Sequence, residues 1–182
     1  MSLRPAQRGF TLVELMVVVA IIAVLAGLMF GVAPRPYDAN AEVIADQVKA
    51  TFIYARTRAV STRKIHRVQF YTSTDNEQIV EIDVAAGTGM AIPASLPTDY
   101  WQVVEVKRVP RSAIIWAAVT SAVTTTGASP AQDTNLPYDV YFKPDGSATA
   151  STIYITDRAG SRHYYRVLVY HTTGSSYARE VW

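Results

Sequence analysis

Residues 9–33 read GFTLVELMVVVAIIAVLAGLMFGVA, an apolar run with one charged side chain, Glu14. From Leu15 to Ala33 the chain is uncharged for 19 positions, which would span about 28 Å as an α-helix at 1.5 Å per residue. That length matches the roughly 30 Å core of a bilayer, whereas the apolar part of a secretory signal peptide has roughly 7 to 15 residues. The stretch predicts a membrane-spanning helix. A carboxylate in lipid costs roughly 2.5 to 3.5 kcal/mol, so Glu14 is expected to have a functional role.

A short basic segment precedes this run. Arg4 and Arg8 lie on its N-terminal side, which favours a cytoplasmic N-terminus and an exported C-terminal part. Cleavage after Gly9 would create a cationic α-amino group on Phe10, one helical turn from Glu14. Such an amine could pair with the carboxylate of a neighbouring chain during assembly.

The heptapeptide Gly9–Leu15, between a basic leader and an apolar helix, resembles the class III signal of type IV pilins and type II secretion pseudopilins. The resemblance implies cleavage between Gly9 and Phe10 by the prepilin peptidase, N-methylation of Phe10, and use of Glu14 in subunit assembly. It also implies a single pass through the bacterial inner membrane, a periplasmic head, and incorporation into a filament after leader removal. A plain signal anchor would explain the length and the basic flank, but not these three residues.

Composition indicates one β-rich domain after the apolar run. The chain has 182 residues, and the part beyond residue 33 is rich in Val, Ile, Thr and Tyr, which suit half-buried strands. It has no cysteine, so disulfides, thiolate metal sites and cysteine nucleophiles are excluded. Loss of a leader that carries Arg4 and Arg8 would lower the formal charge from +2 to 0, so the pI is no guide to partners.

Spacing of apolar residues predicts a second, amphipathic helix that begins near Asp38 or Asn40 and ends near residues 62–64. The stripe Ile44, Val48, Phe52, Ala55 and Ala59 repeats every three or four positions and is expected to pack on a sheet. Asp38 and Asn40 are the expected N-caps. A break is expected between Gly31 and Pro36, because proline interrupts helical hydrogen bonding.

Short extended segments with turn residues between them follow this helix. They are residues 65–72, 78–84, 101–109, 113–117, 138–142, 149–156 and 163–170. Sequential antiparallel pairing is the simplest topology, with the clearest hairpin at Asp157–Gly160. The loops at 85–100 and 119–137 are either surface excursions or subunit contacts.

The predicted fold is α+β and pilin-like: a long N-terminal helix, half in the membrane and half amphipathic, packs on an antiparallel β-sheet head. The predicted domains are a prepilin leader at 1–9, a transmembrane and filament-core helix at 10–33, the periplasmic half of the helix at 34–64, and the β-rich head at 65–182.

The later part of the chain resembles the GspH/FimT-type minor pseudopilins. The turn Phe142–Gly146 before an Ile-rich strand at 152–155 carries this resemblance, whereas Gly174-Ser175 departs from the Gly-Arg common in relatives. The resemblance implies a structural subunit at or near the filament tip that primes assembly with other minor and major pilins, the prepilin peptidase and methyltransferase, and the inner-membrane platform. A type II secretion pseudopilus and a type IV pilus remain open.

A DNA-binding role during uptake is an alternative, because some FimT-like relatives bind DNA through a basic C-terminal segment. Here Arg162, Arg166 and Arg179 alternate with tyrosines, and such groups can grip phosphates and stack on bases. The near-neutral mature chain and the usual packing role of strand tyrosines count against it.

Motifs for catalysis are missing from the sequence. His66, His163 and His171 lack zinc spacing, and there is no Gly-x-Ser-x-Gly, phosphate-binding loop or dinucleotide fingerprint. We therefore expect no enzyme activity, no cofactor and no metal. A membrane-anchored periplasmic binding domain, which would not be processed, is the alternative from another class.

Overall fold

The computed structural model describes residues 12–31, 41–92, 99–120, 122, 136–157 and 164–180. The chain divides into two compact units, Met1–Tyr37 and Asp38–Trp182, and each is considered by itself. Within the described ranges the first unit holds one helix, and the second unit, the head, holds one helix and eight strands.

Helix α1 spans Leu12–Gly31. It contains no proline, and its Leu, Met and Ala residues favour the helix. All side chains from Leu12 to Leu25 are exposed. Apart from Glu14, the residues of this stretch are apolar on every side of the helix, so the helix is not amphipathic. No helix within the described ranges is long and apolar enough to cross a membrane. The bend expected after Gly31 lies outside the described residues.

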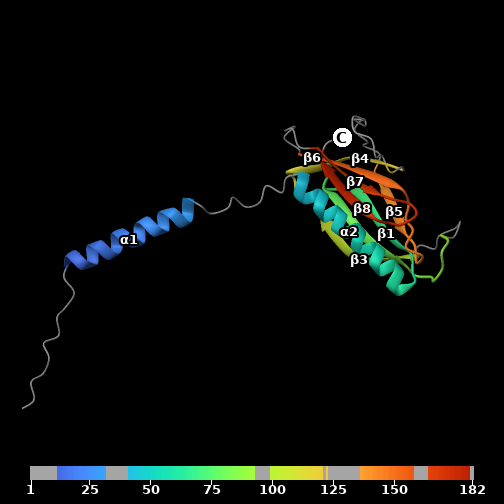
Figure 1. Cartoon of the computed structure of the whole chain (residues 1–182), viewed down its shortest axis with the longest axis horizontal. Coiled ribbons are helices and arrows are strands. Elements are labelled where there is room, and N and C mark those ends of the chain that lie inside the picture. Colours follow the sequence, from blue (N-terminus) through green and yellow to red (C-terminus); the bar gives the residue numbers. More distant parts are fainter. Residues whose placement is uncertain are drawn as a thin grey trace, which may run out of the picture. The chain divides into compact units, whose positions relative to one another are not determined.

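Helix α2 spans Ala41–Thr62 and packs on the strands of the head (Figure 1). The stripe predicted from the sequence is confirmed: Ile44, Val48, Phe52 and the alanines 55 and 59 are all buried. Phe52 lies at the centre of the core, with its ring centroid 5.9 Å from that of Phe70 and 5.7 Å from that of Phe142. One helical face therefore holds strands that are far apart in the sequence.

A distant residue caps α2. The backbone N–H of Ala41 donates a 2.6 Å hydrogen bond to Oδ1 of Asp157, which lies 116 residues later at the end of a strand. The carboxylate satisfies one of the unpaired N–H groups of the first turn. The caps expected from the sequence, Asp38 and Asn40, lie outside the described residues.

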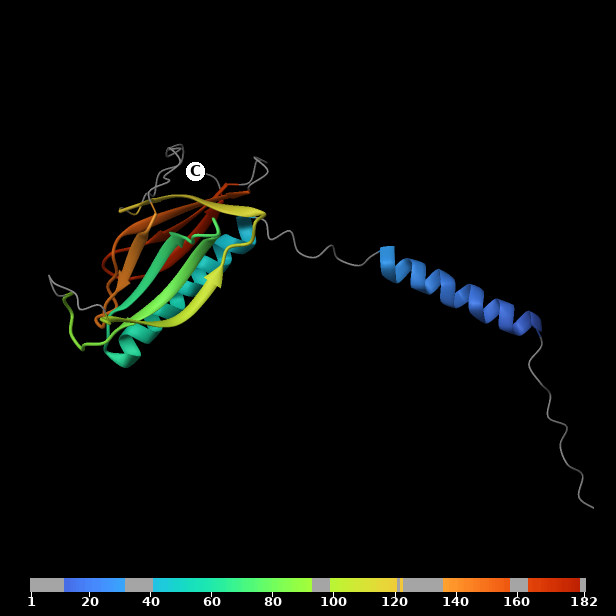
Figure 2. The same ribbon diagram turned by 180° about the vertical axis from the view of Figure 1, so that it is seen from behind.

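The strands form two four-stranded antiparallel sheets, here called sheet A, in the order β3-β2-β1-β5, and sheet B, in the order β4-β6-β7-β8. Their bounds are β1 His66–Thr72, β2 Gln78–Ala85, β3 Trp101–Arg108, β4 Ala113–Val119, β5 Tyr138–Phe142, β6 Ser151–Asp157, β7 Tyr164–Val169 and β8 Ser176–Glu180. Figure 2 shows the head from behind, with β1, β2 and β3 in front of α2.

The strand positions predicted from the sequence are confirmed, with ends that differ by one or two residues. The topology is only partly sequential: β1 pairs with both β2 and β5, and β4 pairs with β6 rather than with β5. Strand β8 was not predicted. The hairpin between β6 and β7 is confirmed by their pairing, although residues 158–163 between them lie outside the described ranges.

Side-chain hydrogen bonds join the two sheets in addition to the core. The amide of Gln78 on β2 donates to the carbonyl of Ile115 on β4 at 2.9 Å, and it accepts from the N–H of the same residue at 2.7 Å. Gln78 thus acts as a strand partner for Ile115, next to the irregularity in the pairing of β4 with β6. Inner side chains of both sheets and the buried face of α2 form one hydrophobic core.

Candidate functional site

Of the residues predicted to act in processing and assembly, Glu14 lies within the described ranges. Glu14 lies in the first turn of α1, where the helix dipole favours a carboxylate, and its side chain is exposed. Gly9 and Phe10, the predicted cleavage and methylation positions, lie outside the described residues. The four-residue spacing from Phe10 to Glu14 corresponds to one helical turn.

The three arginines of the DNA-binding alternative are not brought together as a described surface. Arg166 is only 1% exposed, so its guanidinium does not lie where a duplex could reach it. Arg179 is exposed on β8, where it lines a shallow hollow of about 370 Å³ with the edge-to-face pair Tyr170 and Tyr177. Arg162 lies outside the described residues.

A polar cluster on sheet A was missed by sequence reasoning. Arg67 on β1 donates from Nε to Oδ2 of Asp83 on β2 at 2.8 Å, and it lies 3.6 Å from the carboxylate of Asp139 on β5. Its guanidinium also lies 4.6 Å from the ring centroid of Trp101, whose ring is 5.8 Å from that of Tyr141. Trp101 of β3 and Tyr141 of β5 thus meet across the sheet and cover the ion pair.

This cover explains why Asp83 is fully buried although it lies on the face of sheet A that is turned away from α2. Asp83 alternates along β2 with Val80 and Ile82, whose side chains face the core. No local pattern in the sequence indicates the long-range contact between Trp101 and Tyr141.

Burial is the largest influence on the pKa values of Asp83 and Tyr141 in this cluster. Burial raises the pKa of Asp83, the hydrogen bonds and charge of Arg67 lower it, and the neighbouring Glu81 raises it further. Burial, followed by the hydrogen bond to Asp139 at 2.8 Å, raises the pKa of Tyr141 to about 12. The cluster is therefore a rigid structural network, in which Tyr141 remains a neutral hydrogen-bond donor.

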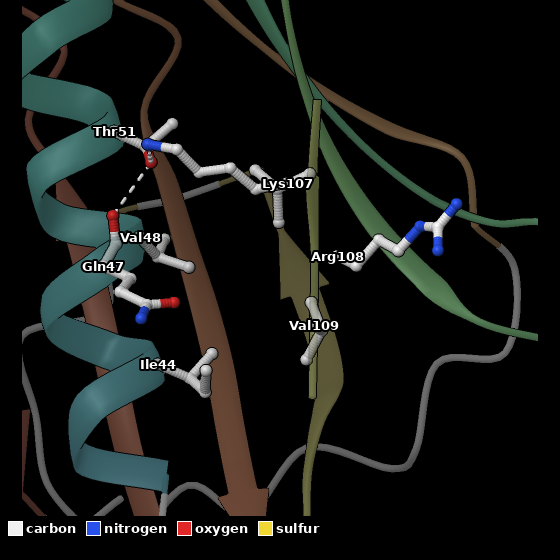
Figure 3. Close-up of a pocket in the computed structure, with 8 residues that line it drawn as sticks. Ile44, Gln47, Val48, Thr51, Lys107, Arg108 and Val109 are labelled. Atoms are coloured by element: carbon white, nitrogen blue, oxygen red, sulfur yellow. Dashed lines mark hydrogen bonds between the residues drawn. The ribbon is translucent and has the colours of Figure 1, made fainter. Parts of the chain in front are cut away.

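A narrow slot separates α2 from the edge strand β3 (Figure 3). Ile44 and Val48 of α2 line one side, Val109 lies on the other side, and Nζ of Lys107 reaches across to donate to Oγ1 of Thr51 at 3.3 Å. The slot has a volume of about 10 Å³, which is room for about one water molecule. It is therefore too small for an organic ligand.

No metal centre can be assembled from the described residues, because none of their His, Asp and Glu side chains form a group of three that could hold an ion. What these residues offer is surface for protein contacts: an apolar helix in the first unit, and a two-sheet head with an exposed edge strand in the second.

An apolar N-terminal helix and a separate α+β head, in which a helix packs on antiparallel sheets, define a pilin-like subunit. Residues 4–30 match the family model of the prokaryotic N-terminal methylation motif, and residues 45–174 match that of the type II transport protein GspH. The chain belongs to the GspH family of minor pseudopilins. The sequence was compatible with both a type II secretion pseudopilus and a type IV pilus. The matched family is that of type II transport.

Solved structures similar to the chain include two of the minor pseudopilin EpsH from the type 2 secretion system of Vibrio cholerae. The first is 11% identical and covers 78% of this chain and 96% of that chain, with a TM-score of 0.50. The second is 12% identical and covers 78% and 92%, also with a TM-score of 0.50. At this identity the likeness shows the fold alone. No curated protein sequence matches the chain.

Family membership settles the general class of function. Pseudopilins are structural subunits and not enzymes, and they assemble with other pilin-type subunits. The methylation motif is of the kind that the prepilin peptidase processes, and the family suggests a membrane-anchored protein.

Proposed function

We propose that this chain is a minor pseudopilin that lies at or near the tip of a type II secretion pseudopilus and primes its assembly. The observation that carries the proposal is the presence of both matches in one chain, the methylation motif over residues 4–30 and the GspH family over residues 45–174. The partners are the other minor and major pseudopilins, the prepilin peptidase and methyltransferase, and the inner-membrane assembly platform.

Processing starts assembly in this proposal. The peptidase removes residues 1–9, and the new α-amino group of Phe10 is methylated. The membrane segment then consists of residues 10–33, which extend beyond α1 at both ends, and the head faces the periplasm because Arg4 and Arg8 keep the N-terminus cytoplasmic.

Helix α1 then serves as the element that is transferred. Its side chains from Leu12 to Leu25 are exposed on all sides, which requires apolar surroundings, either lipid or neighbouring helices. Moving such a helix from lipid into a filament core exchanges one apolar environment for another, so little hydrophobic free energy is lost on extraction.

Glu14 sets the register in this proposal. Its carboxylate pairs with the α-amino group of Phe10 of an adjacent subunit in the filament core. A wrong axial offset would leave the two charges apart in an apolar environment, which is strongly unfavourable, whereas the correct offset brings them together.

Mass spectrometry of the chain recovered from its native host tests the processing step. We expect a mature chain that begins at N-methylated Phe10. A chain that keeps residues 1–9, or that is cut elsewhere, would contradict the proposal and favour a plain membrane anchor.

The pairing step is tested by Glu14→Ala. We expect normal leader removal and at least a tenfold loss of incorporation into sheared filaments, measured by immunoblotting, because each 1.4 kcal/mol of lost pairing corresponds to about a factor of ten. Glu42→Ala is the matched control, since Glu42 is also an exposed carboxylate in the first turn of a helix. Normal entry of the Glu14 variant into filaments would rule the pairing out.

A further inference from the structure

The side chains of strand β3 point alternately to the two faces of sheet A. Lys107 points toward α2 and donates to Thr51, whereas Arg108 points away from α2 (Figure 3). Because side chains alternate along a strand, Val106 lies on the same side as Arg108, and the pairing register with β2 confirms its face. It places Val106 opposite Glu81 and Lys107 opposite Val80.

The register assigns Val106 to the face of Glu81. Residues directly opposite in an antiparallel pair share a face, and Glu81 alternates with the buried, core-facing Val80 and Ile82. We call the face of sheet A that is turned away from α2 the outer face. Val103, opposite Asp83 on the far side of a bulge, lies on it as well.

Apolar surface is therefore exposed on the outer face. Val103 is 59% exposed and Val106 is 49% exposed, while the charged Glu105 and Lys107 lie 3.4 Å apart within the same strand. Isolated exposed valines need no explanation, but these two lie beside Trp101, on the same strand and next to the cluster described above.

Negative charge is in excess beside these valines. Glu81 accepts a 2.7 Å hydrogen bond from the hydroxyl of Tyr71, and no cation lies within ion-pair distance of it among the described residues. Asp83 and Asp139 share one guanidinium, that of Arg67. The carboxylates of β2 and β5 on the outer face thus outnumber the cation between them.

Addition of a strand to the free edge of β3 is the less favourable mode of contact. The pairing with β2 is interrupted between Ile82 and Asp83, and such bulges twist an edge away from regular pairing. Glu105 and Lys107 also place charges on the strand, another feature that protects natural edges from strand addition. The face, not the edge, is therefore the surface open to a partner.

A second copy of this chain fits the outer face poorly. In a twofold contact the same patch would meet itself, so the excess of carboxylates on one copy would lie against the same excess on the other. A partner with a basic side chain would instead supply the charge that Glu81 lacks.

We propose that the outer face around Val103, Val106 and Glu81 docks another subunit of the filament, one that presents a lysine or arginine flanked by apolar side chains. The guanidinium of Arg67 lies 4.6 Å from the ring centroid of Trp101, so each side chain holds the other in place. Tryptophan and arginine are among the residue types that contribute most binding energy at protein interfaces. The proposal rests on the proposed function, since it requires a neighbouring subunit.

Site-specific crosslinking in cells tests the surface, because the chain has no cysteine of its own. The full chain, produced with the other pseudopilins, would carry Val106→Cys labelled with a benzophenone maleimide. Tyr177→Cys on β8 is the matched control, since Tyr177 is 52% exposed and lies in sheet B. We expect at least a tenfold higher yield of an adduct with another pseudopilin from position 106.

The charge requirement is tested in the same experiment. Glu81→Lys should lower the adduct at least tenfold, whereas Glu105→Lys, also on sheet A but on β3, should leave it within about twofold, since one decade corresponds to 1.4 kcal/mol. Unchanged tryptophan fluorescence confirms that both variants fold. Equal adduct yields from positions 106 and 177, an adduct with a second copy of the chain, or insensitivity to Glu81→Lys would each overturn the proposal.

Failure of this surface can be told apart from failure of the proposed function. A chain that is processed at Phe10 and enters filaments, but gives no adduct from position 106, contradicts the docking surface alone. A chain that retains its leader and forms no adduct contradicts both.

Discussion

Arg67 is the cation on which the buried part of the outer face depends. It is the hydrogen-bond donor to Asp83, a carboxylate that is fully buried. Removal of one partner from a buried ion pair is costly because the remaining charge stays desolvated. The same residue supports the ring of Trp101, so its loss would also loosen the aromatic cover.

We expect Arg67→Ala to lower the free energy of unfolding by about 3 kcal/mol. Urea unfolding of the detergent-solubilised chain, followed by tryptophan fluorescence, measures this, since all three tryptophans lie beyond residue 100. Arg111→Ala is the control: Arg111 pairs with Glu77 at 3.6 Å, but its side chain is 81% exposed, so a change of about 0 to 1 kcal/mol is expected. If both changes lowered the free energy of unfolding equally, the buried ion pair would stabilise the head no more than the exposed one.

His66 makes stability depend on pH. Burial lowers its pKa below the ordinary value of 6.5, the hydrogen bond to the carbonyl of Lys64 opposes this, and the charges of Arg58 and Lys64 lower it further. Between the folded pKa and 6.5 the unfolded chain binds more protons than the folded chain. Stability therefore rises with pH in this window, and it is lost as the pH falls below 6.5.

The corresponding test compares the chain with His66→Gln at about pH 7.5 and about pH 5.5, on either side of the ordinary histidine pKa. We expect the urea midpoint of the unchanged chain to fall more on acidification than that of the variant. The difference between the two proteins isolates His66 from the carboxylates, which titrate in both. Parallel shifts would contradict the assignment.

At the scale of elements, two turns and a helix meet at Gly174. This residue follows β7 with φ of 58°, a left-handed conformation that favours glycine. A methyl group added there would collide with the carbonyl oxygen of Gly146, in the turn after β5, and would crowd the side chain of Arg56 on α2. Arg56 Nε donates to the same carbonyl at 3.4 Å, so the three elements are held together at one point.

Gly174→Ala should therefore destabilise the head by about 1 to 3 kcal/mol, through backbone strain and displacement of the Gly146 turn. Thermal unfolding monitored by circular dichroism would show a lower midpoint. Gly87→Ala is the matched control, because nothing lies within 4 Å of an added methyl group there, and a change within about 0.5 kcal/mol is expected. A midpoint for the Gly174 variant equal to that of the control would show that the contact can relax without cost.

At the scale of the whole head, Gln78 couples the two sheets. Gln78→Ala leaves the N–H and the carbonyl of Ile115 without the hydrogen bonds that the amide provides. We expect a loss of about 1 to 3 kcal/mol, as for other unsatisfied polar groups. Hydrogen exchange should report faster exchange of the Ile115 amide.

The control for this change is Gln102→Ala. Gln102 lies exposed on β3, so its replacement should change stability by no more than about 0.5 kcal/mol and leave the Ile115 amide protected. Unaltered exchange at Ile115 in the Gln78 variant would contradict the role of this side chain as a strand partner.

The features of the head that could be predicted from the sequence are those that depend on the spacing of neighbouring residues. The stripe from Ile44 to Ala59 repeats every three or four residues, and β1 and β2 alternate, so both could be assigned without knowledge of their partners. Strand β8 was missed because Ser176–Glu180 is short and contains no β-branched residue. The polar cluster was missed because it joins Trp101 to Tyr141 across a sheet whose strand order was unknown.

By itself the sequence determined the N-terminal motif with Glu14, the two helices and most of the strands, because hydrophobic period and residue identity act over a few neighbouring positions. The tertiary structure alone decided that the strands divide into two sheets, that Asp157 caps α2, that Arg166 is buried, and that the valines of β3 face outward. These features depend on pairings between residues that lie tens of positions apart, where the register and a single bulge decide which face each side chain occupies.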